Sequence, residues 1–362
     1  MLSEIGSNFW LDPNLIFEKK DIGTPQQFNC KGMDCAWLST GRSAIESAIR
    51  AIEKRCPDLK KVAVLPSFTC DTVFEPLLKC GYEVFYYPVE RDLTTTSDAI
   101  LETALHFDAS IVLFHRYFGF DTLDRQVDRM CDILRGIGKY TIEDCTQCLY
   151  SDIPRADSDY TVGSIRKWTG TPDGGFIVSH KMRLNDKPVS YDIELERAKV
   201  EASYAKYHFL FEHKGDKGEM LEMYSNAEAI LDNQDRIYAI SKMSSKVQAN
   251  LDREELVRKR RENFDCLSKN LKDYVEPVFA LRKENVPLYF PILVNDRASL
   301  QKHLVQNAIY APVVWPKNEE QPLQCDGAEN AYQHLLCIPI DQRYGLDDMG
   351  RIVEVINGFY RK

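Results

Sequence analysis

The sequence predicts an α/β protein in which a mostly parallel, doubly wound sheet forms a large domain and a smaller C-terminal α+β domain follows. Two observations predict this fold. The chain has 362 residues, more than one ordinary hydrophobic core organises, so two domains are expected. Short β-type runs also alternate with helical patterns from residue 62 to residue 142. Such alternation is typical of a parallel sheet with helices on its faces.

The elements of the large domain follow one another in a regular order. Residues 1–36 contain several Pro and Gly breakers and are predicted to be irregular. Apolar residues then recur at helical spacing within 37–53, behind a Ser-Thr-Gly start, which predicts a helix. The expected strands are 62–65, 84–87, 110–114, 140–142, 160–162 and 176–178, and the expected further helices are 71–79, 97–105 and 123–134.

The second half of the chain is less regular. Residues 183–220 are charged and lack apolar periodicity, so an excursion or long loop is predicted there, and one long helix is predicted over 232–270. Placing the domain boundary near residue 245 gives a large domain of 1–245 and a small domain of 246–362. The small domain is expected to contain strands 288–294, 310–315 and 335–339 and helices 300–306 and 347–359.

Composition limits the function classes. The apolar fraction of 44% and charged fraction of 28% are those of a soluble globular protein, and no run of 18 apolar residues or secretory signal occurs. A net charge of -9 argues against a nucleic-acid-binding protein. The eleven cysteines are scattered without a zinc-type spacing, so free thiols and no metal site are expected. A cytoplasmic protein that acts on a metabolite is predicted.

One lysine lies on a short loop between two β-type runs. Lys167 follows the 160–162 run and Gly163, and a Pro-Asp-Gly-Gly turn signal leads from it into 176–178. Between sheet elements a lysine can lose hydration, which lowers the pKa of its amine and leaves it free to form an imine with an aldehyde. The alternative interpretation is an ordinary solvated surface lysine.

Other segments supply groups that such a lysine needs. Asp144 stands just past a buried strand, where ligands bind in this architecture, and can pair with a ring nitrogen; a cap or turn carboxylate is the alternative. The helix start presents free N–H groups that suit a phosphate, although an ordinary cap has the same sequence. The residues expected to contribute to a phosphate site are Gly41, Arg42, Ser43 and Ser164, and Gln147 is expected to hydrogen-bond a ring hydroxyl. Lysine, carboxylate and phosphate cradle together predict pyridoxal phosphate as the cofactor.

With these residues the chain resembles the fold type I pyridoxal phosphate enzymes and, more narrowly, the DegT/StrS family of sugar aminotransferases. The resemblance covers most of the chain. It is carried by short segments in a specific order: 39–45, 65–70 with Gly81, 142–147, 163–168 with 173–175, Arg260-Arg261 with Asn263, and 337–340.

The resemblance implies roles for individual residues. Lys167 would carry the cofactor and, with Asp144 at the ring nitrogen, form the catalytic pair. Gln147 would contact the ring oxygen, and the turn 41–43 with Ser164 would hold the phosphate. The family usually has an aromatic residue at the position of Cys70, so the ring would lie against Cys70 or a substitute, for which Phe68, His115 and Tyr117 are unranked candidates.

The resemblance implies that the protein is an aminotransferase. It would move an amino group from an amino acid, expected to be glutamate, to a keto-sugar, and the keto-sugar could be linked to a nucleotide. A homodimer with sites at the subunit interface is implied as well. Two alternatives stay open: another reaction of the same cofactor, such as dehydration or a lyase reaction, and a regulatory protein that only binds it.

Overall fold

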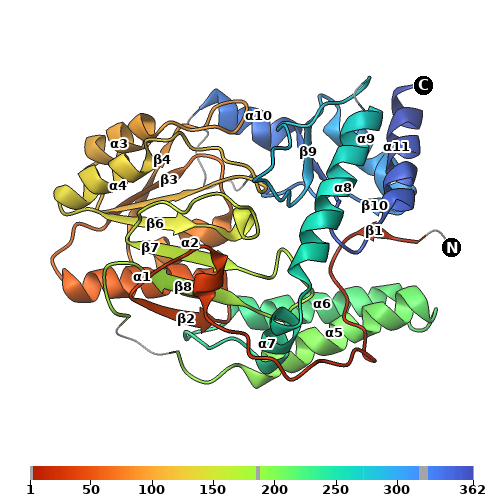
Figure 1. Ribbon diagram of the computed structural model, residues 1–362, viewed down its shortest axis with the longest axis horizontal. Helices are drawn as coiled ribbons and strands as arrows, with labels where there is room; N and C mark the ends of the chain where they lie inside the picture. Colours follow the sequence, from red (N-terminus) through yellow and green to blue (C-terminus); the bar gives the residue numbers. More distant parts are fainter. Residues whose placement is uncertain (1–2, 185–187, 272, 318–324, 362) are drawn as a thin grey trace.

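The computed structural model describes residues 3–184, 188–271, 273–317 and 325–361. Its main feature is a seven-stranded sheet with the order β2-β8-β7-β6-β5-β3-β4 (Figure 1). The strands are β2 (Asp34–Leu38), β3 (Val62–Pro66), β4 (Glu83–Tyr87), β5 (Ile111–His115), β6 (Tyr140–Asp144), β7 (Tyr160–Ser164) and β8 (Gly175–Ser179). The five neighbouring strands β4, β3, β5, β6 and β7 are parallel, whereas β8 runs antiparallel to both β7 and β2. The predicted α/β class with a mostly parallel sheet is therefore confirmed.

Helices cover both faces of this sheet. Along β3 the buried side chains alternate: Ala63 and Leu65 pack with α1 (Gly41–Arg55) and α2 (Asp71–Lys79), and Val62 and Val64 pack with α3 (Ser97–His106) and α4 (Val127–Gly136). This period of two is that of a strand with both faces buried. The doubly wound arrangement follows, and it brings the carboxyl ends of β3, β5 and β6 to one edge.

The predicted strands and helices between residues 62 and 178 are all present, and each begins within one residue of its predicted start except one helix. Helix α4 begins at Val127 instead of 123 because Asp124 instead accepts hydrogen bonds from the backbone N–H and hydroxyl of Ser97 at the start of α3. The prediction that 1–36 is irregular is wrong in part. Strand β2 begins at Asp34, and this antiparallel strand fills the edge beside β8. The segment reads Asp-Cys-Ala-Trp-Leu, and its apolar residues 37 and 38 were assigned to the start of the following helix.

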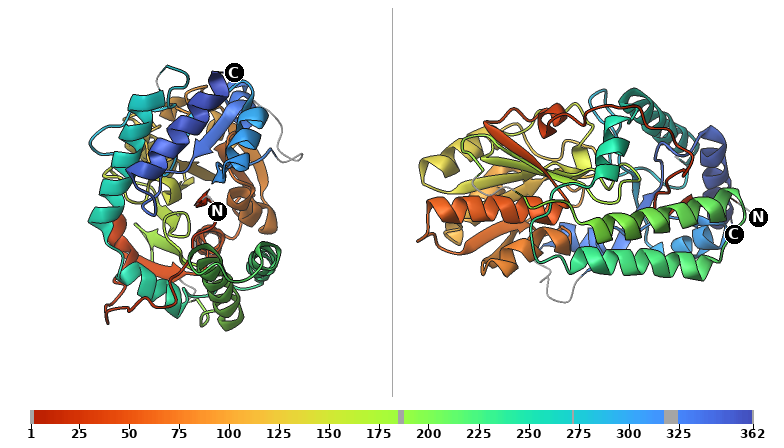
Figure 2. Two further views of the ribbon diagram at one scale, coloured as in Figure 1. Left: turned by 90° about the vertical axis from the view of Figure 1, so that its right-hand side faces the viewer. Right: turned by 90° about the horizontal axis from the view of Figure 1, so that it is seen from below.

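The excursion or long loop predicted over 183–220 is wrong where the chain is helical, and residues 185–187 of that prediction lie outside the described residues. Two helices, α5 (Ile193–Phe211) and α6 (Lys217–Asp232), lie side by side as a pair (Figure 2). Each starts with an aspartate cap, because Asp192 accepts from Leu195 N at 3.1 Å and Asp216 accepts from Gly218 N at 2.7 Å. Few of their side chains are buried, so the sequence shows no apolar stripe although its residues favour helix.

The single helix predicted over 232–270 is also wrong. Helix α6 ends at Asp232, and the segment continues as α7 (Lys242–Ala249) and α8 (Arg253–Leu271). Ser241 caps α7 by accepting from Ser244 N, and the Asp252 carboxylate accepts from Glu255 N at 2.9 Å at the start of α8. These two caps divide a sequence whose composition is helical throughout.

The C-terminal part contains a second, small sheet. Strands β9 (Phe290–Leu293) and β11 (Leu335–Ile338) pair antiparallel, and α9 (Arg297–Gln306), α10 (Asp326–His334) and α11 (Leu346–Tyr360) accompany them. The predicted strand 310–315 is reduced to β10 (Ile309–Tyr310), which pairs with β1 (Ile5–Gly6). Ile5 and Phe68 share a hydrophobic cluster with the C-terminal helices. The boundary near residue 245, which falls in α7, stays a prediction.

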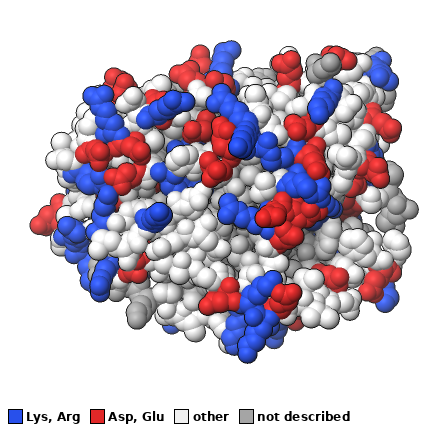
Figure 3. Space-filling model, in the orientation of Figure 1, with Lys and Arg blue, Asp and Glu red and all other residues white. Residues whose placement is uncertain are grey.

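Charge is mixed over the face drawn in Figure 3, where Lys and Arg side chains alternate with Asp and Glu instead of gathering in one patch. Within the described residues, no helix combines the length and apolar character needed to cross a membrane.

Candidate active site

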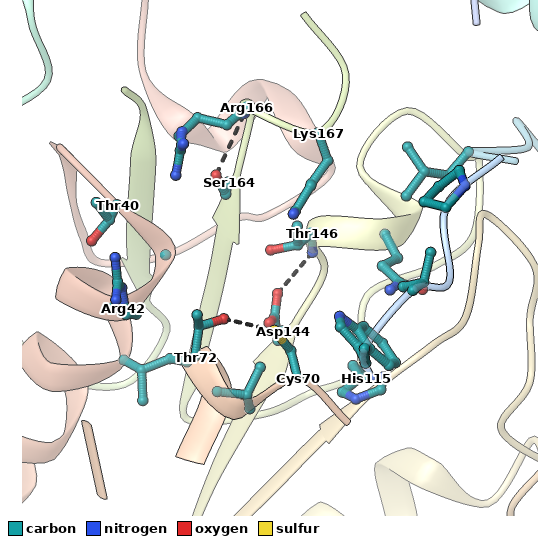
Figure 4. A pocket seen from close by; sticks show the side chains of 18 of the residues that line it. Thr40, Arg42, Cys70, Thr72, His115, Asp144, Thr146, Ser164, Arg166 and Lys167 are labelled. Atoms are coloured by element: carbon teal, nitrogen blue, oxygen red, sulfur yellow. Dashed lines mark hydrogen bonds between the residues drawn. The ribbon is translucent and has the colours of Figure 1, made fainter. Parts of the chain in front are cut away.

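A cavity of about 440 Å³ lies beyond the carboxyl ends of β5 and β6. It collects residues from segments that are far apart in the sequence. Seven of the eight site residues predicted from the sequence line it: Gly41, Arg42, Cys70, Asp144, Gln147, Ser164 and Lys167. Figure 4 shows the Lys167 side chain extending into this cavity, toward the side where Asp144 stands.

The loop between β7 and β8 positions Lys167. The loop closes through a bond from Ile165 N to Gly174 O at 3.0 Å and a bond from the Ser164 hydroxyl to the same oxygen at 3.0 Å. The next residue, Trp168, is fully buried, and its Nε1 donates to Thr146 O at 2.7 Å. The lysine loop is thus fastened to the loop that follows Asp144.

The Lys167 amine has an unusual environment. The side chain is accessible to solvent, but only from inside the cavity that it lines. The walls of the cavity therefore surround the amine and reduce its hydration. This loss of hydration, together with the charge of Arg166, lowers the pKa of Lys167. Among the described residues, no hydrogen bond or ion pair engages Nζ. The amine is available for chemistry.

Asp144 ends β6, and within the described part of the chain its carboxylate accepts a hydrogen bond through one oxygen only. Its Oδ1 accepts from Thr146 N at 2.8 Å, and the group lines the cavity. Desolvation raises the pKa of Asp144 despite the bond from Thr146. A cation in the cavity would restore the charged form, as a protonated ring nitrogen does.

Gln147 lies in η2 (Thr146–Cys148) and presents a defined donor. Its Oε1 accepts from Phe118 N at 2.8 Å, so the amide orientation is set and the NH₂ group remains for the cavity. The side chain is 7% exposed. A hydrogen-bond donor, and not an acceptor, is therefore offered to a ligand at this point.

The start of α1 forms one end of the cavity. Gly41 and Arg42 line it with the first N–H groups of the helix, which have no intrahelical partner. Ser43 does not line it. Its N–H donates to Thr40 Oγ1 at 2.9 Å, and its hydroxyl lies 2.8 Å from the same oxygen. Ser43 thus makes an ordinary cap with Thr40.

Two glycines let the lysine loop approach this helix start. A Cβ on Gly175 would lie 2.0 Å from Thr40 O, and Gly174 has a φ of +127°. The neighbouring Asp173 accepts from Ser241 N at 3.1 Å and from Ser241 Oγ at 2.8 Å. Burial raises the pKa of Asp173 to about 6. The Asp-Gly-Gly signal therefore marks a close contact between α1, the lysine loop and α7.

The wall beside Cys70 contains aromatic rings that the sequence could not rank. His115 lines the cavity, whereas Phe68 and Tyr117 are buried behind it. Burial lowers the pKa of His115 to about 3, so its ring is neutral. Trp315 also lines the cavity, with its ring centroid 5.6 Å from that of His115. Trp315 is the last residue of the strand predicted over 310–315, but its backbone φ of +58° lies outside the strand range, and the strand pattern gave it no role in the site.

Sequence reasoning also missed two ion pairs made by arginines that line the cavity. Arg166 lines the cavity, and its Nη2 donates to Glu228 of α6 at 2.8 Å, while Arg42 pairs with Asp232 at 2.6 Å. No element was predicted over 221–231, so Glu228 was given no place near the site. Burial, opposed by bonds to Thr72 and the charge of Lys167, raises the pKa of Cys70 to about 11.

Known proteins resemble this chain in one part by sequence and over nearly its whole length by fold. Residues 240–357 match the model of the DegT/DnrJ/EryC1/StrS aminotransferase family. No curated protein sequence matches. Helicobacter pylori PseC, an aminotransferase involved in the biosynthesis of pseudoaminic acid, has a TM-score of 0.66 at 16% identity, with 98% of both chains covered.

Two further solved structures are similar. A putative sugar aminotransferase from Streptococcus pneumoniae in its PMP form has a TM-score of 0.64 at 13% identity and 98% coverage of both chains. A DegT DnrJ EryC1 StrS aminotransferase from Brucella abortus has a TM-score of 0.62 at 17% identity, over 95% of this chain and 92% of that chain. Residues 240–357 are thus similar in sequence to the DegT/DnrJ/EryC1/StrS aminotransferase family that the motifs predicted, and the whole chain shares its fold with solved aminotransferases.

Proposed function

We propose that this protein is a pyridoxal phosphate-dependent aminotransferase that transfers an amino group from an amino acid, glutamate, to a keto-sugar. The observation that carries the proposal is one cavity lined by Lys167, Asp144 and the first turn of α1. These are the amine, the carboxylate and the phosphate donors that this cofactor requires, and they come from three separate elements.

The donor and acceptor chemistry of the cavity fits the cofactor. Asp144 keeps one carboxylate oxygen free for a protonated ring nitrogen, and Gln147 offers an N–H donor for the ring oxygen. The N–H groups of Gly41 and Arg42 suit the phosphate. Ser164 also lines the cavity, and Ser43 would act indirectly by holding Thr40.

Lys167 has two tasks in this proposal. It would hold the cofactor through its amine, which the lowered pKa makes nucleophilic, and once freed it would take a proton from the substrate carbon and return it at the acceptor position. When bound, pyridoxal phosphate supplies an electron sink for the pair left by that proton. Asp144 maintains the ring charge, and the loop bonds of Trp168 and Gly174 keep the amine in place.

Relatives of similar fold support the substrate class. PseC acts in the biosynthesis of pseudoaminic acid, and the Streptococcus pneumoniae protein is a putative sugar aminotransferase. A cytoplasmic homodimer is part of the same proposal. Exposed apolar side chains on the α5–α6 pair, Ile193 at 68% and Phe211 at 52%, offer a surface for a second copy.

The absorption spectrum of the purified protein, with and without glutamate, tests the proposal. Protein loaded with pyridoxal phosphate should absorb near the visible edge, lose that band when glutamate is added, and release 2-oxoglutarate. A band that glutamate leaves unchanged would point to a regulatory cofactor binder. A change of the band without 2-oxoglutarate would point to another reaction of the cofactor.

A further inference from the structure

A short N-terminal strap, residues 7–9, stands between two further chambers beside the reactive lysine. One chamber, of about 370 Å³, lies toward the C-terminal elements, and the other, of about 260 Å³, lies toward the α5–α6 pair. The strap, Lys167 and Tyr289 line both chambers. In Figure 1 the N-terminal segment, drawn in red, runs from β1 to this helix pair. A molecule that reacts at Lys167 and extends into either chamber therefore lies against the strap.

Side chains from distant elements hold the backbone of the strap. Each of its three carbonyl oxygens accepts a hydrogen bond: Ser7 O from Arg343 at 3.2 Å, Asn8 O from Lys206 at 2.6 Å and Phe9 O from Tyr224 at 2.7 Å. Ser7 has a φ of +66°, a left-handed conformation that residues with a Cβ seldom adopt. The path of the strap is thus fixed through its backbone, which leaves the Asn8 side chain out of the anchoring.

Two uncharged groups at the strap have no partner. Asn8 is exposed, and among the described residues no hydrogen bond engages its side-chain amide. The hydroxyl of Tyr289 also has no hydrogen-bond partner in the part of the chain that the structure describes. Burial raises the pKa of Tyr289, so this hydroxyl stays protonated. An amide and a hydroxyl can each both donate and accept a hydrogen bond.

Charged side chains around the strap are paired with one another. Asp341 accepts two bonds from Arg343, at 2.7 Å to Oδ1 and 2.9 Å to Oδ2. In the smaller chamber Glu228 pairs with both Arg166 and Lys199. The free groups that face a ligand at the strap are therefore the uncharged ones. Groups that both donate and accept match a ligand with hydroxyl groups, which do the same.

We propose that the strap recognises the sugar acceptor, and that the Asn8 amide binds a ring hydroxyl of this sugar as a specificity-determining residue. A site that hydrogen-bonds a hydroxyl discriminates against an analogue that lacks it, because the polar group of the site is then left without its partner. Glutamate has no hydroxyl, so the amino-acid donor should not depend on Asn8. The inference rests on the proposed function for the reaction at Lys167, and it adds the residue that selects the acceptor.

The two half-reactions of the protein loaded with pyridoxal phosphate test this role. Glutamate should bleach the absorbance near the visible edge, and in the reverse direction an amino-sugar should do the same, giving its amino group to the cofactor and leaving as the keto-sugar. Stopped-flow mixing measures the concentration at half-maximal rate and the limiting rate for each substrate. The probes are glucose derivatives with the amino group at carbon 2, 3 or 4, each free and as its nucleoside diphosphate ester.

Asn8→Ala should raise the half-maximal concentration of the reacting amino-sugar about tenfold and leave its limiting rate within about twofold. Both glutamate values should stay at those of the wild type. Because the Asn8 side chain anchors nothing among the described residues, the thermal unfolding midpoint should not change.

Asn14→Ala is the matched control. Asn14 is the same residue type in the same N-terminal segment, is exposed and lines neither chamber, so both half-reactions should keep their wild-type values. Deoxy analogues of the reacting amino-sugar then locate the contact. The analogue without the recognised hydroxyl should lose about tenfold in affinity for the wild type and nothing further for Asn8→Ala. A general disturbance of the strap would not depend on one hydroxyl in this way.

Equal amino-sugar values for the wild type and Asn8→Ala would overturn the inference and leave the proposed function intact. An equal loss for glutamate and the amino-sugar would also overturn it, since Asn8 would then not select the acceptor. Bleaching by glutamate but by no amino-sugar would exclude the sugar acceptor, and with it the role of the strap. Bleaching by neither substrate would refute the proposed function itself.

Discussion

Lys167 and Lys206 both have amines whose pKa the surrounding protein lowers, but they lie in regions that use the amine differently. Lys167 stands on the loop between β7 and β8 and faces a cavity. Lys206, on α5, is 1% exposed, and its Nζ donates to Ser7 Oγ at 2.9 Å and Asn8 O at 2.6 Å. Burial and the charge of Arg343 lower the pKa of Lys206 to about 7.

The difference shows that a lowered pKa does not by itself mark a reactive amine. Lys206 fastens the N-terminal segment to α5 through its two hydrogen bonds, and it does not line the cavity that contains Lys167. Lys167 has no such partner among the described residues and opens on a cavity that also contains Asp144. Unused bonding capacity next to space for a substrate, added to the pKa, separates a functional lysine from a structural one.

Replacing each of the two lysines in turn should give the largest difference in activity. Lys167→Ala should lower transamination by several orders of magnitude and remove the absorbance near the visible edge, because no other amine occupies that loop. The thermal unfolding midpoint should change little, since Nζ contributes no bond among the described residues. Lys206→Met is the control, which should retain the absorbance. A Lys167→Ala protein that stays yellow and active would refute the assignment.

Asp144→Ala comes next in expected size. Without the carboxylate the ring nitrogen loses its counter-charge and the ring becomes a poor electron sink, so turnover should fall by about two to four orders of magnitude while cofactor binding partly persists. Steady-state rates with saturating cofactor measure this. Normal turnover would mean that Asp144 only caps the turn through Thr146.

Lys206→Met should affect stability instead of chemistry. The loss of two bonds leaves Ser7 and Asn8 without their donor and should cost about 1–3 kcal/mol of the free energy of unfolding. Chemical denaturation with both proteins at the same pH measures it. An unchanged stability would contradict the structural role given to this amine.

The same lysine predicts a pH dependence. Its pKa falls from 10.5 to about 7 on folding, so between these values the unfolded chain binds more protons than the folded one. The stability of the wild type should therefore rise with pH in this window, by up to about 1.4 kcal/mol per pH unit, relative to Lys206→Met. A difference between the two proteins that does not change from pH 7 to pH 9 would contradict the burial of the amine.

Cys70→Ala is expected to have the smallest effect. Among the residues that the structure describes, the thiol bonds only to Asp71 and Thr72 of its own helix start, and its pKa of about 11 keeps it protonated and unreactive. Activity should fall by less than about tenfold, because His115 and Trp315 also form that wall. Initial rates decide this, and a larger loss would make Cys70 a direct contact of the ring.

The sheet and its site could be predicted from sequence to different extents. Buried strands such as 62–65 and capped helices such as 97–105 carry their own local signal, and the strand ends placed Asp144 and Gln147 near one another. The α5–α6 pair carries no apolar stripe, so its helices, and with them Glu228 beside Arg166, were missed. Trp315 enters the site through a left-handed backbone turn that no periodicity reveals.

Borohydride reduction followed by peptide mapping tests the central claim most directly. Reduction fixes pyridoxal phosphate to the lysine that carries it, and the mapped peptide names that lysine. Lys167 should carry the label in the wild type and in Lys206→Met. A label on Lys206 or on Lys199, whose pKa burial also lowers to about 8, or no label at all, would contradict the assignment of Lys167.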